Sequence, residues 1–132
     1  MHDMHGEVLA GINRLLPMLS KTAKPLTSHD LYEIINSQTT IFMAFSDEGP
    51  HRIVGMASLV VAYQTVGIVC HVEDVVTDEA CRGQGIGEKL MRRLIEALPD
   101  GWRQLDLTSK PDRGPAHRLY LRLGFDERET GN

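Results

Sequence analysis

Residues 72–98 read VEDVVTDEACRGQGIGEKLMRRLIEAL, and this stretch decides the fold. It opens with a β-branched run at residues 72–76, which predicts a buried strand, and continues through a short polar break. The apolar residues that follow have helical spacing, namely Ile86, Leu90, Met91, Leu94, Ile95 and Leu98. The sequence therefore predicts a strand, a turn and a helix in direct succession.

Three glycines, Gly83, Gly85 and Gly87, alternate through the turn and into the start of the helix. Each would cost a helix interior about 1 kcal/mol relative to alanine, so we expect them to serve unusual backbone angles or a close approach. The first N–H groups of a helix lack intrahelical partners and lie at the positive end of the helix dipole. A turn without side chains lets a pyrophosphate reach these amides, so the stretch is a candidate phosphate cradle.

Spacing separates the phosphate-binding motifs that begin in this way. The P-loop is excluded because no Gly-Lys-Ser or Gly-Lys-Thr closes the turn, and the dinucleotide fingerprint fails because Glu88 stands three positions after Gly85. The pattern that remains is Arg-x-x-Gly-x-Gly at Arg82, Gly85 and Gly87. Taken alone, the glycines also fit a β-to-α turn that binds no ligand.

Composition limits the classes of function. A chain of 132 residues fits one domain, 1–132, and its net charge of −4 argues against a nucleic-acid surface and favours cationic acceptors such as amines. No apolar run approaches the roughly 18 residues of a membrane span, and the start lacks a secretory signal, so we expect a cytoplasmic protein that does not enter a membrane. Cys70 and Cys81 are expected to be free thiols. We expect no metal site, since Cys70 and His71 fit core and surface positions better than ligand positions.

The elements around the decisive stretch follow from periodicity and turn residues. We expect helices at residues 7–19, with Pro17 near the end, and from residue 28 behind hydroxyl caps at Thr27 and Ser28. We expect strands at residues 40–46, 52–63, 68–76 and 103–109, then a helix from Pro115 to Gly124 and a further strand from Phe125. Gly55, inside the second strand, predicts a bulge or a close backbone approach.

A second motif stands at residues 116–125, which read AHRLYLRLGF. It resembles the final helix of the GNAT superfamily of N-acyltransferases, with its Tyr-x-x-x-Gly-Phe ending, just as Arg82 to Gly87 resembles that superfamily's acetyl-coenzyme A signature. The resemblance covers residues 40–125 and implies an α/β (α+β) fold. In that fold a central mixed, mostly antiparallel sheet, splayed at the cofactor site, is flanked by about four helices. Residues 71–76 also look like the corresponding strand of glucosamine-6-phosphate N-acetyltransferases.

Both ends of the chain depart from the family's pattern. Nothing ahead of Glu7 reads as the usual first strand, and the usual last strand is replaced by a polar run after Phe125. The outer strands are therefore either missing or completed across a homodimer, because exposed edges invite pairing.

The resemblance implies acetyl transfer from acetyl-coenzyme A to the primary amine of a small molecule or peptide by direct attack. Amides around Gly83, Gln84, Gly85, Gly87 and Glu88, together with Arg82, match the positions that hold the pyrophosphate. Val75 and Val76 match those that pair with the pantetheine arm and face the thioester oxygen. The same fold also fits a second function, a non-catalytic sensor of acetyl-coenzyme A that regulates a partner protein.

Two side chains are candidates for moving protons. Tyr120 corresponds to the tyrosine that many members use to protonate the departing sulfur, and its alternative is a packed helix tyrosine. Glu73 is a candidate acceptor for the amine's proton, directly or through water. Strand alternation puts Glu73 and Asp74 on opposite faces, so one of them points into the acceptor cleft; a salt bridge and a helix cap are the alternative roles.

Overall fold

The described part of the protein is built on one sheet with helices on both faces. The structure is a computed structural model, and it describes residues 4–47 and 52–107. Its elements in chain order are α1 (Met4–Leu19), α2 (Ser28–Ile35), β1 (Thr39–Phe45), β2 (Ile53–Gln64), β3 (Gly67–Thr77), the 3-10 turn η1 (Glu79–Cys81), α3 (Ile86–Glu96) and β4 (Trp102–Leu107). The helix and strand expected from residue 115 onward lie outside the described residues.

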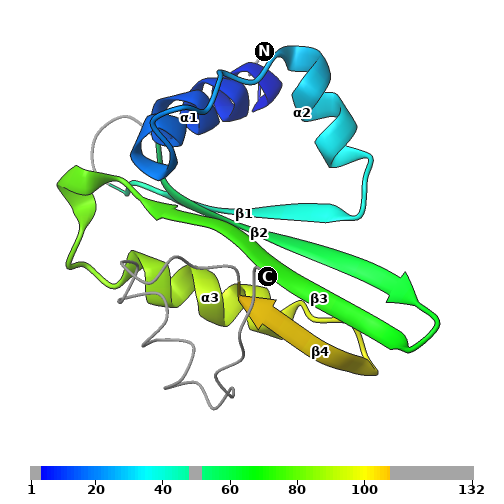
Figure 1. The fold of residues 1–132 in the computed structure, drawn as a ribbon. Helices are drawn as coiled ribbons and strands as arrows, with labels where there is room; N and C mark the ends of the chain where they lie inside the picture. The colour runs from blue at the N-terminus through cyan, green and yellow to red at the C-terminus, as the bar shows by residue number, and fades with distance from the viewer. Residues whose placement is uncertain (1–3, 48–51, 108–132) are drawn as a thin grey trace.

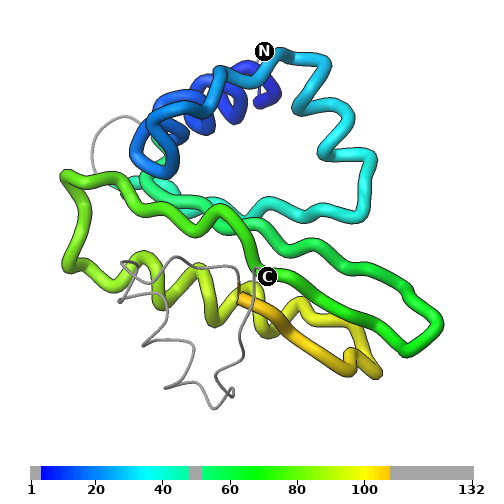
Figure 2. Tube along the Cα trace, viewed as in Figure 1, coloured from blue at the N-terminus to red at the C-terminus, as the bar shows by residue number. Residues whose placement is uncertain are grey.

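The strands stand in the order β1-β2-β3-β4. β1 with β2 and β2 with β3 pair antiparallel, and β3 with β4 pairs parallel. The parallel pair is possible because the chain leaves β3, passes under the sheet as α3 and returns alongside β3 as β4, as Figure 2 shows. The expected mixed, mostly antiparallel sheet is confirmed.

The helices divide between the two faces of the sheet (Figure 1). α3 covers one face, over a core that includes Leu59, Val72, Met91 and Leu105. α1 and α2 cover the other face, over a second core formed by Ile12, Leu15, Leu31, Ile53, Met56 and Val76. Alternate strand residues therefore serve different cores, which explains why β2 is buried along most of its length.

The two N-terminal helices begin close to where the sequence places them. α1 starts three residues earlier than expected, at Met4, and keeps Pro17 inside its last turn. α2 has the expected cap, in which Thr27 Oγ1 accepts from the Asp30 N–H and the Asp30 carboxylate accepts from the Thr27 N–H. The Thr27 N–H lowers the pKa of Asp30, because the bond favours the ionised carboxylate.

Gly55 is where α3 comes closest to the sheet. A Cβ built at Gly55 would stand 2.9 Å from Cγ2 of Ile86 and 3.2 Å from Cδ1 of Leu90. The strand pairing also shifts here, because Ala44 pairs with Gly55 while Phe45 pairs with Ile53. Both a bulge and a close approach are therefore present, and the glycine sets how near the start of α3 lies to β2.

We expect Gly55→Ala to destabilise the protein by about 1–3 kcal/mol, because the added methyl group has no space beneath α3. Urea unfolding measures this loss. Ile86→Ala removes the atom that would clash, so the double variant Gly55→Ala/Ile86→Ala should lose less than the sum of the two single losses. Strictly additive losses would contradict the close approach.

Candidate functional site

A β-bulge interrupts β3 at Asp74 and Val75. On the side of β2, Met56 pairs with Val76 and Ser58 pairs with Glu73, so a single β2 residue, Ala57, faces the two residues between them. Asp74 has a φ of 56°, the one positive φ of a non-glycine residue in the described part of the chain. Such an angle is uncommon for residues other than glycine, although asparagine and aspartate adopt it more often than most, and a bulge is one of the places where it occurs.

The bulge reverses the alternation of side chains along β3. Before it, Val72 lies in the core under α3; after it, Val75 packs against that same core and Val76 lies in the core under α1. Glu73 is half-buried and Asp74 is exposed. Simple alternation along the sequence predicted that these two acidic side chains lie on opposite faces. The structure adds that Asp74 has no register partner in β2, because it lies in the bulge.

β3 has a neighbouring strand on each side along the segment before the bulge. β3 pairs with β4 from Ile68–Trp102 to Val72–Leu107, whereas it pairs with β2 as far as Thr77. Figure 1 shows β4 alongside the first part of β3. Leu107 is the last residue that the structure describes in this part of the chain, so the splay expected at the cofactor site stays a prediction.

The predicted cradle lies at the N-terminus of α3. Gly83 has a φ of 85°, and Gly85, the N-cap of α3, has a φ of 76°. A Cβ at either position would meet nothing within 4 Å, so backbone angle and not packing requires these glycines. The backbone can therefore be approached closely from outside, as a pyrophosphate needs.

The structure brings the predicted cradle residues together in one turn. Arg82, Gly83, Gln84 and Gly85 are exposed, and Gly87 and Glu88 are half-buried in the first turn of α3. The Glu88 carboxylate accepts from Nη2 of Arg92 at 2.8 Å. Tyr120 lies outside the described residues, so its role in protonating the departing sulfur stays a prediction.

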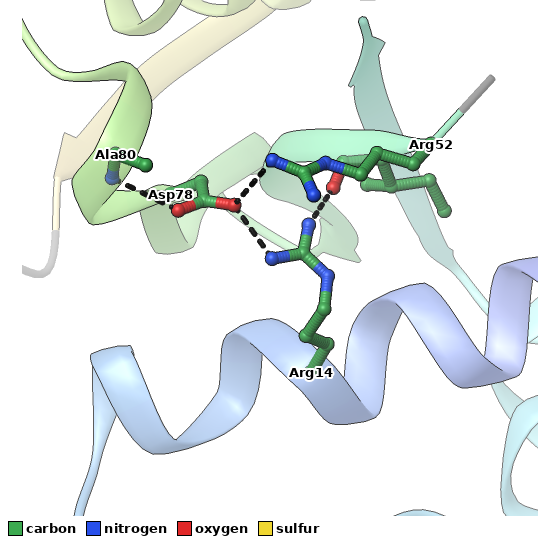
Figure 3. Close-up of polar contacts among 5 residues, drawn as sticks. Arg14, Arg52, Asp78 and Ala80 are labelled. Atoms are coloured by element: carbon green, nitrogen blue, oxygen red, sulfur yellow. Dashed lines mark hydrogen bonds and ion pairs between the residues drawn. The ribbon is translucent and has the colours of Figure 1, made fainter. Parts of the chain in front are cut away.

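An ion pair that the sequence did not reveal fixes the entrance to this turn (Figure 3). Asp78 directly follows β3 and is 3% exposed. Nη1 of Arg14, on α1, lies 2.5 Å from its Oδ2, the Ala80 N–H donates to Oδ1 at 3.0 Å, and Nη2 of Arg52 lies 3.9 Å away. Nη2 of Arg14 also donates to the Ile53 carbonyl.

This network ties the helix on one face of the sheet to the turn that leads to the other face. The Arg14 hydrogen bond, with help from the Ala80 N–H, lowers the pKa of Asp78. Two weak signals could have pointed to it: Asp78 stands where an Asp caps a following turn, and Arg14 is the one Lys or Arg in α1. Neither signal identifies the partner, which is 64 residues away in the chain.

Both cysteines are free thiols, as expected. Cys70 is fully buried, and burial raises the pKa of its thiol, so it stays protonated in the core. Within residues 4–47 and 52–107, no three His, Cys, Asp or Glu side chains are grouped so as to hold a metal. Among these same residues, no helix combines the length and apolar character needed to cross a membrane.

Residues 12–125 match the Acetyltransferase (GNAT) family. The chain belongs to this family. Among solved GNAT-like structures, a Trypanosoma brucei acetyltransferase is 29% identical with a TM-score of 0.79, over 98% of this chain and 93% of that one. A transcriptional regulator from Bacillus halodurans C-125 is 27% identical with a TM-score of 0.78, over 100% and 95%. The fold expected from the sequence is therefore confirmed.

Curated relatives agree on a part of the chain. Glucosamine 6-phosphate N-acetyltransferase 1 of Oryza sativa subsp. japonica is 40% identical over 65 residues, which are 48% of this chain and 38% of that protein. Mycothiol acetyltransferase of Frankia alni is 41% identical over 78 residues. The chain spans between 22% and 38% of the length of the curated relatives it matches.

We expect Asp78→Asn to lower the free energy of unfolding at neutral pH by on the order of 2 kcal/mol, because a buried charge-assisted hydrogen bond is lost. The lowered pKa makes this contribution present above the unfolded value of about 4, and it disappears as pH falls through the folded value. The gap between wild type and variant should therefore narrow in acid, as urea unfolding at several pH values would show. Glu79→Gln, an equal charge change at an exposed neighbour, is the control, and a gap independent of pH would contradict the role of the ion pair.

Proposed function

We propose that this chain is an acetyl-coenzyme A-dependent N-acetyltransferase that acts on a primary amine of a small molecule or peptide. The observation that carries the proposal is the turn in which Gly83 and Gly85, both at positive φ and open to approach, lead into α3 directly after the bulged strand. Family membership and the N-acetyltransferase names of relatives support it.

The cradle fits the pyrophosphate of coenzyme A in shape and charge. Backbone N–H groups at Gly83, Gln84, Gly85, Gly87 and Glu88 would hold it, at the end of α3 where the helix dipole favours an anion. Arg82 follows η1 with an extended backbone and brings a cation to the same turn. Acetyl-coenzyme A supplies the activated acyl group; no metal is part of the proposal.

Residues of β3 would orient the reacting groups. We assign the pantetheine arm to the segment after the bulge, at Val75 and Val76, where the strand has turned away from its earlier alternation. Glu73, half-buried before the bulge, would accept the amine's proton, directly or through water. Tyr120 would donate a proton to the departing sulfur.

The proposal extends to partners and compartment. The acceptor is an amine, which the acidic net charge of −4 favours, and neither nucleic acid nor a membrane is a partner. Free thiols at Cys70 and Cys81 fit a reducing cytoplasm. A homodimer would cover the outer edge of β1, which pairs with no further strand in the described part of the chain.

A regulator that binds acetyl-coenzyme A without turnover is the second candidate, favoured by the solved structure described as a transcriptional regulator. Calorimetry with coenzyme A tests what both candidates share. Thiol release from acetyl-coenzyme A then separates them, with glucosamine 6-phosphate, sisomicin and an alanine-starting peptide as acceptors taken from the names of similar proteins. Binding with amine-dependent release supports the enzyme, and binding with release unaffected by any acceptor supports the regulator.

We expect Gly85→Val to abolish coenzyme A binding in a folded protein, because a branched side chain would fill the approach to the amides. Calorimetry and a melting curve measure the two effects. Gly101→Val is the matched control. Gly101 also has a positive φ, of 81°, and an added Cβ there would meet nothing within 4 Å, yet it lies beyond the far end of α3. Equal affinity of the two variants for coenzyme A would contradict the proposal that this turn binds the pyrophosphate.

We expect Tyr120→Phe to lower kcat on the order of a hundredfold while KM for acetyl-coenzyme A hardly changes, because the phenol acts as a general acid only in the transition state. Folding should be retained, since the ring stays. Steady-state kinetics beside a melting curve measure both. A variant with full turnover per folded molecule would remove Tyr120 from the mechanism.

A further inference from the structure

The parallel pair of β3 and β4 brings a histidine and a carboxylate together across the sheet. His71 and Asp106 are register partners, and Nδ1 of His71 lies 3.6 Å from Oδ2 of Asp106. Their chain neighbours Cys70, Val72, Leu105 and Leu107 all lie in the core under α3. Because strand side chains alternate, His71 and Asp106 lie on the opposite face, the face of α1 and α2.

The carboxylate of this pair is held in place from its own strand. Nε2 of Gln104 donates to both Asp106 oxygens, at 3.0 and 2.9 Å. The Asp106 side chain is 16% exposed, whereas the His71 side chain is 34% exposed. A fixed, largely buried carboxylate therefore stands beside an imidazole that solvent and ligands can reach.

Glu73 continues the row toward the bulge. It lies two residues after His71 in β3 and before the bulge reverses the alternation, so both side chains are on the same face. Strand residues two apart are separated by roughly 7 Å along the backbone, a distance that long side chains or one water can bridge. The row Asp106, His71, Glu73 thus ends directly before the bulge, next to the segment at Val75 and Val76 that we assign to the pantetheine arm.

The acetylation of an amine requires a base that accepts a proton from the amine, and this row of side chains offers one. An ammonium ion must lose a proton before its nitrogen can attack, and a base whose ordinary pKa lies near the working pH serves best. The ordinary pKa of glutamate is about 4.3 and that of histidine about 6.5. Near neutral pH an imidazole therefore keeps a proton taken from an ammonium more readily than a lone carboxylate does. A carboxylate beside Nδ1 favours the tautomer that carries its proton on Nδ1, which leaves Nε2 as the accepting nitrogen.

We propose that His71, held by Asp106, takes up the proton that the acceptor amine releases, with Glu73 or a water molecule passing it on. This rests on the proposed acetyl transfer. One proton leaves the ammonium for Nε2 of His71, the nitrogen forms its bond to the thioester carbon, and the carbon–sulfur bond breaks. The nitrogen's second proton leaves and the sulfur gains one, so the products are an amide, a thiol and one proton that His71 returns to solvent.

The test is chemical rescue at constant pH. We expect His71→Ala to lower kcat on the order of a hundredfold with the best amine of the panel, while coenzyme A affinity and the melting temperature stay at the wild-type values. Added imidazole should restore turnover in this variant, because the vacated position is open to solvent. Asp106→Asn should lower kcat without any response to imidazole, since its own histidine is still present.

Control variants separate this role from a structural one. His29→Ala, at an exposed histidine of α2, should keep wild-type turnover and ignore imidazole. If His71→Ala proves unstable, His71→Gln keeps a polar side chain there and should show the same loss of kcat. Two results would overturn the proposed proton transfer to His71 alone. They are full turnover by either His71 variant, and a loss of kcat in His71→Ala that imidazole does not restore. A wild type that binds coenzyme A and releases no thiol with any amine would overturn the proposed acetyl transfer, and with it the proton transfer to His71.

Discussion

The bulge at Asp74 and Val75 is the constraint on which the rest of the site depends. A strand that kept its alternation would send Asp74 into the core under α3, where an unpaired carboxylate is costly to bury. One residue at positive φ removes that conflict and returns Val75 to the core. The same residue separates the first segment of β3 from the segment that leads to the turn at Gly83 and Gly85. The bulge therefore determines both the packing of this part of β3 and the geometry of the proposed site.

Two further contacts fix what the bulge separates. Gly55 lets the start of α3 lie against β2, and the Arg14–Asp78 ion pair holds the exit from β3 to α1 on the opposite face. The turn at Gly83 and Gly85 stands between these two anchors. It needs little packing of its own, because a Cβ at either glycine would touch nothing, and this openness is what a ligand approaching the amides requires.

Short-range patterns predicted much of this, and long-range partners set the limit. Helical spacing, caps and glycine positions depend on neighbours within a few residues, so α2 with its Thr27 cap, the glycine turn and α3 could be predicted from the sequence. The bulge could not, because simple alternation assumes a regular strand, and an aspartate tolerates a left-handed angle without requiring one. Arg14 with Asp78, and His71 with Asp106, depend on helix placement and strand register, which no local pattern contains.

The parallel pairing of β3 with β4 has a consequence for the order of folding. The β2–β3 hairpin closes over a short turn, with Gln64 facing Gly67, and can form from local contacts. The β3–β4 pair joins Ile68 to Trp102, so it must wait until α3 has crossed beneath the sheet. His71 and Asp106 therefore meet only in a late, non-local step. A nascent chain interrupted before β4 would hold the glycine turn and α3 without the neighbouring strand. During synthesis, the proposed anion site would therefore be complete before the proposed amine site.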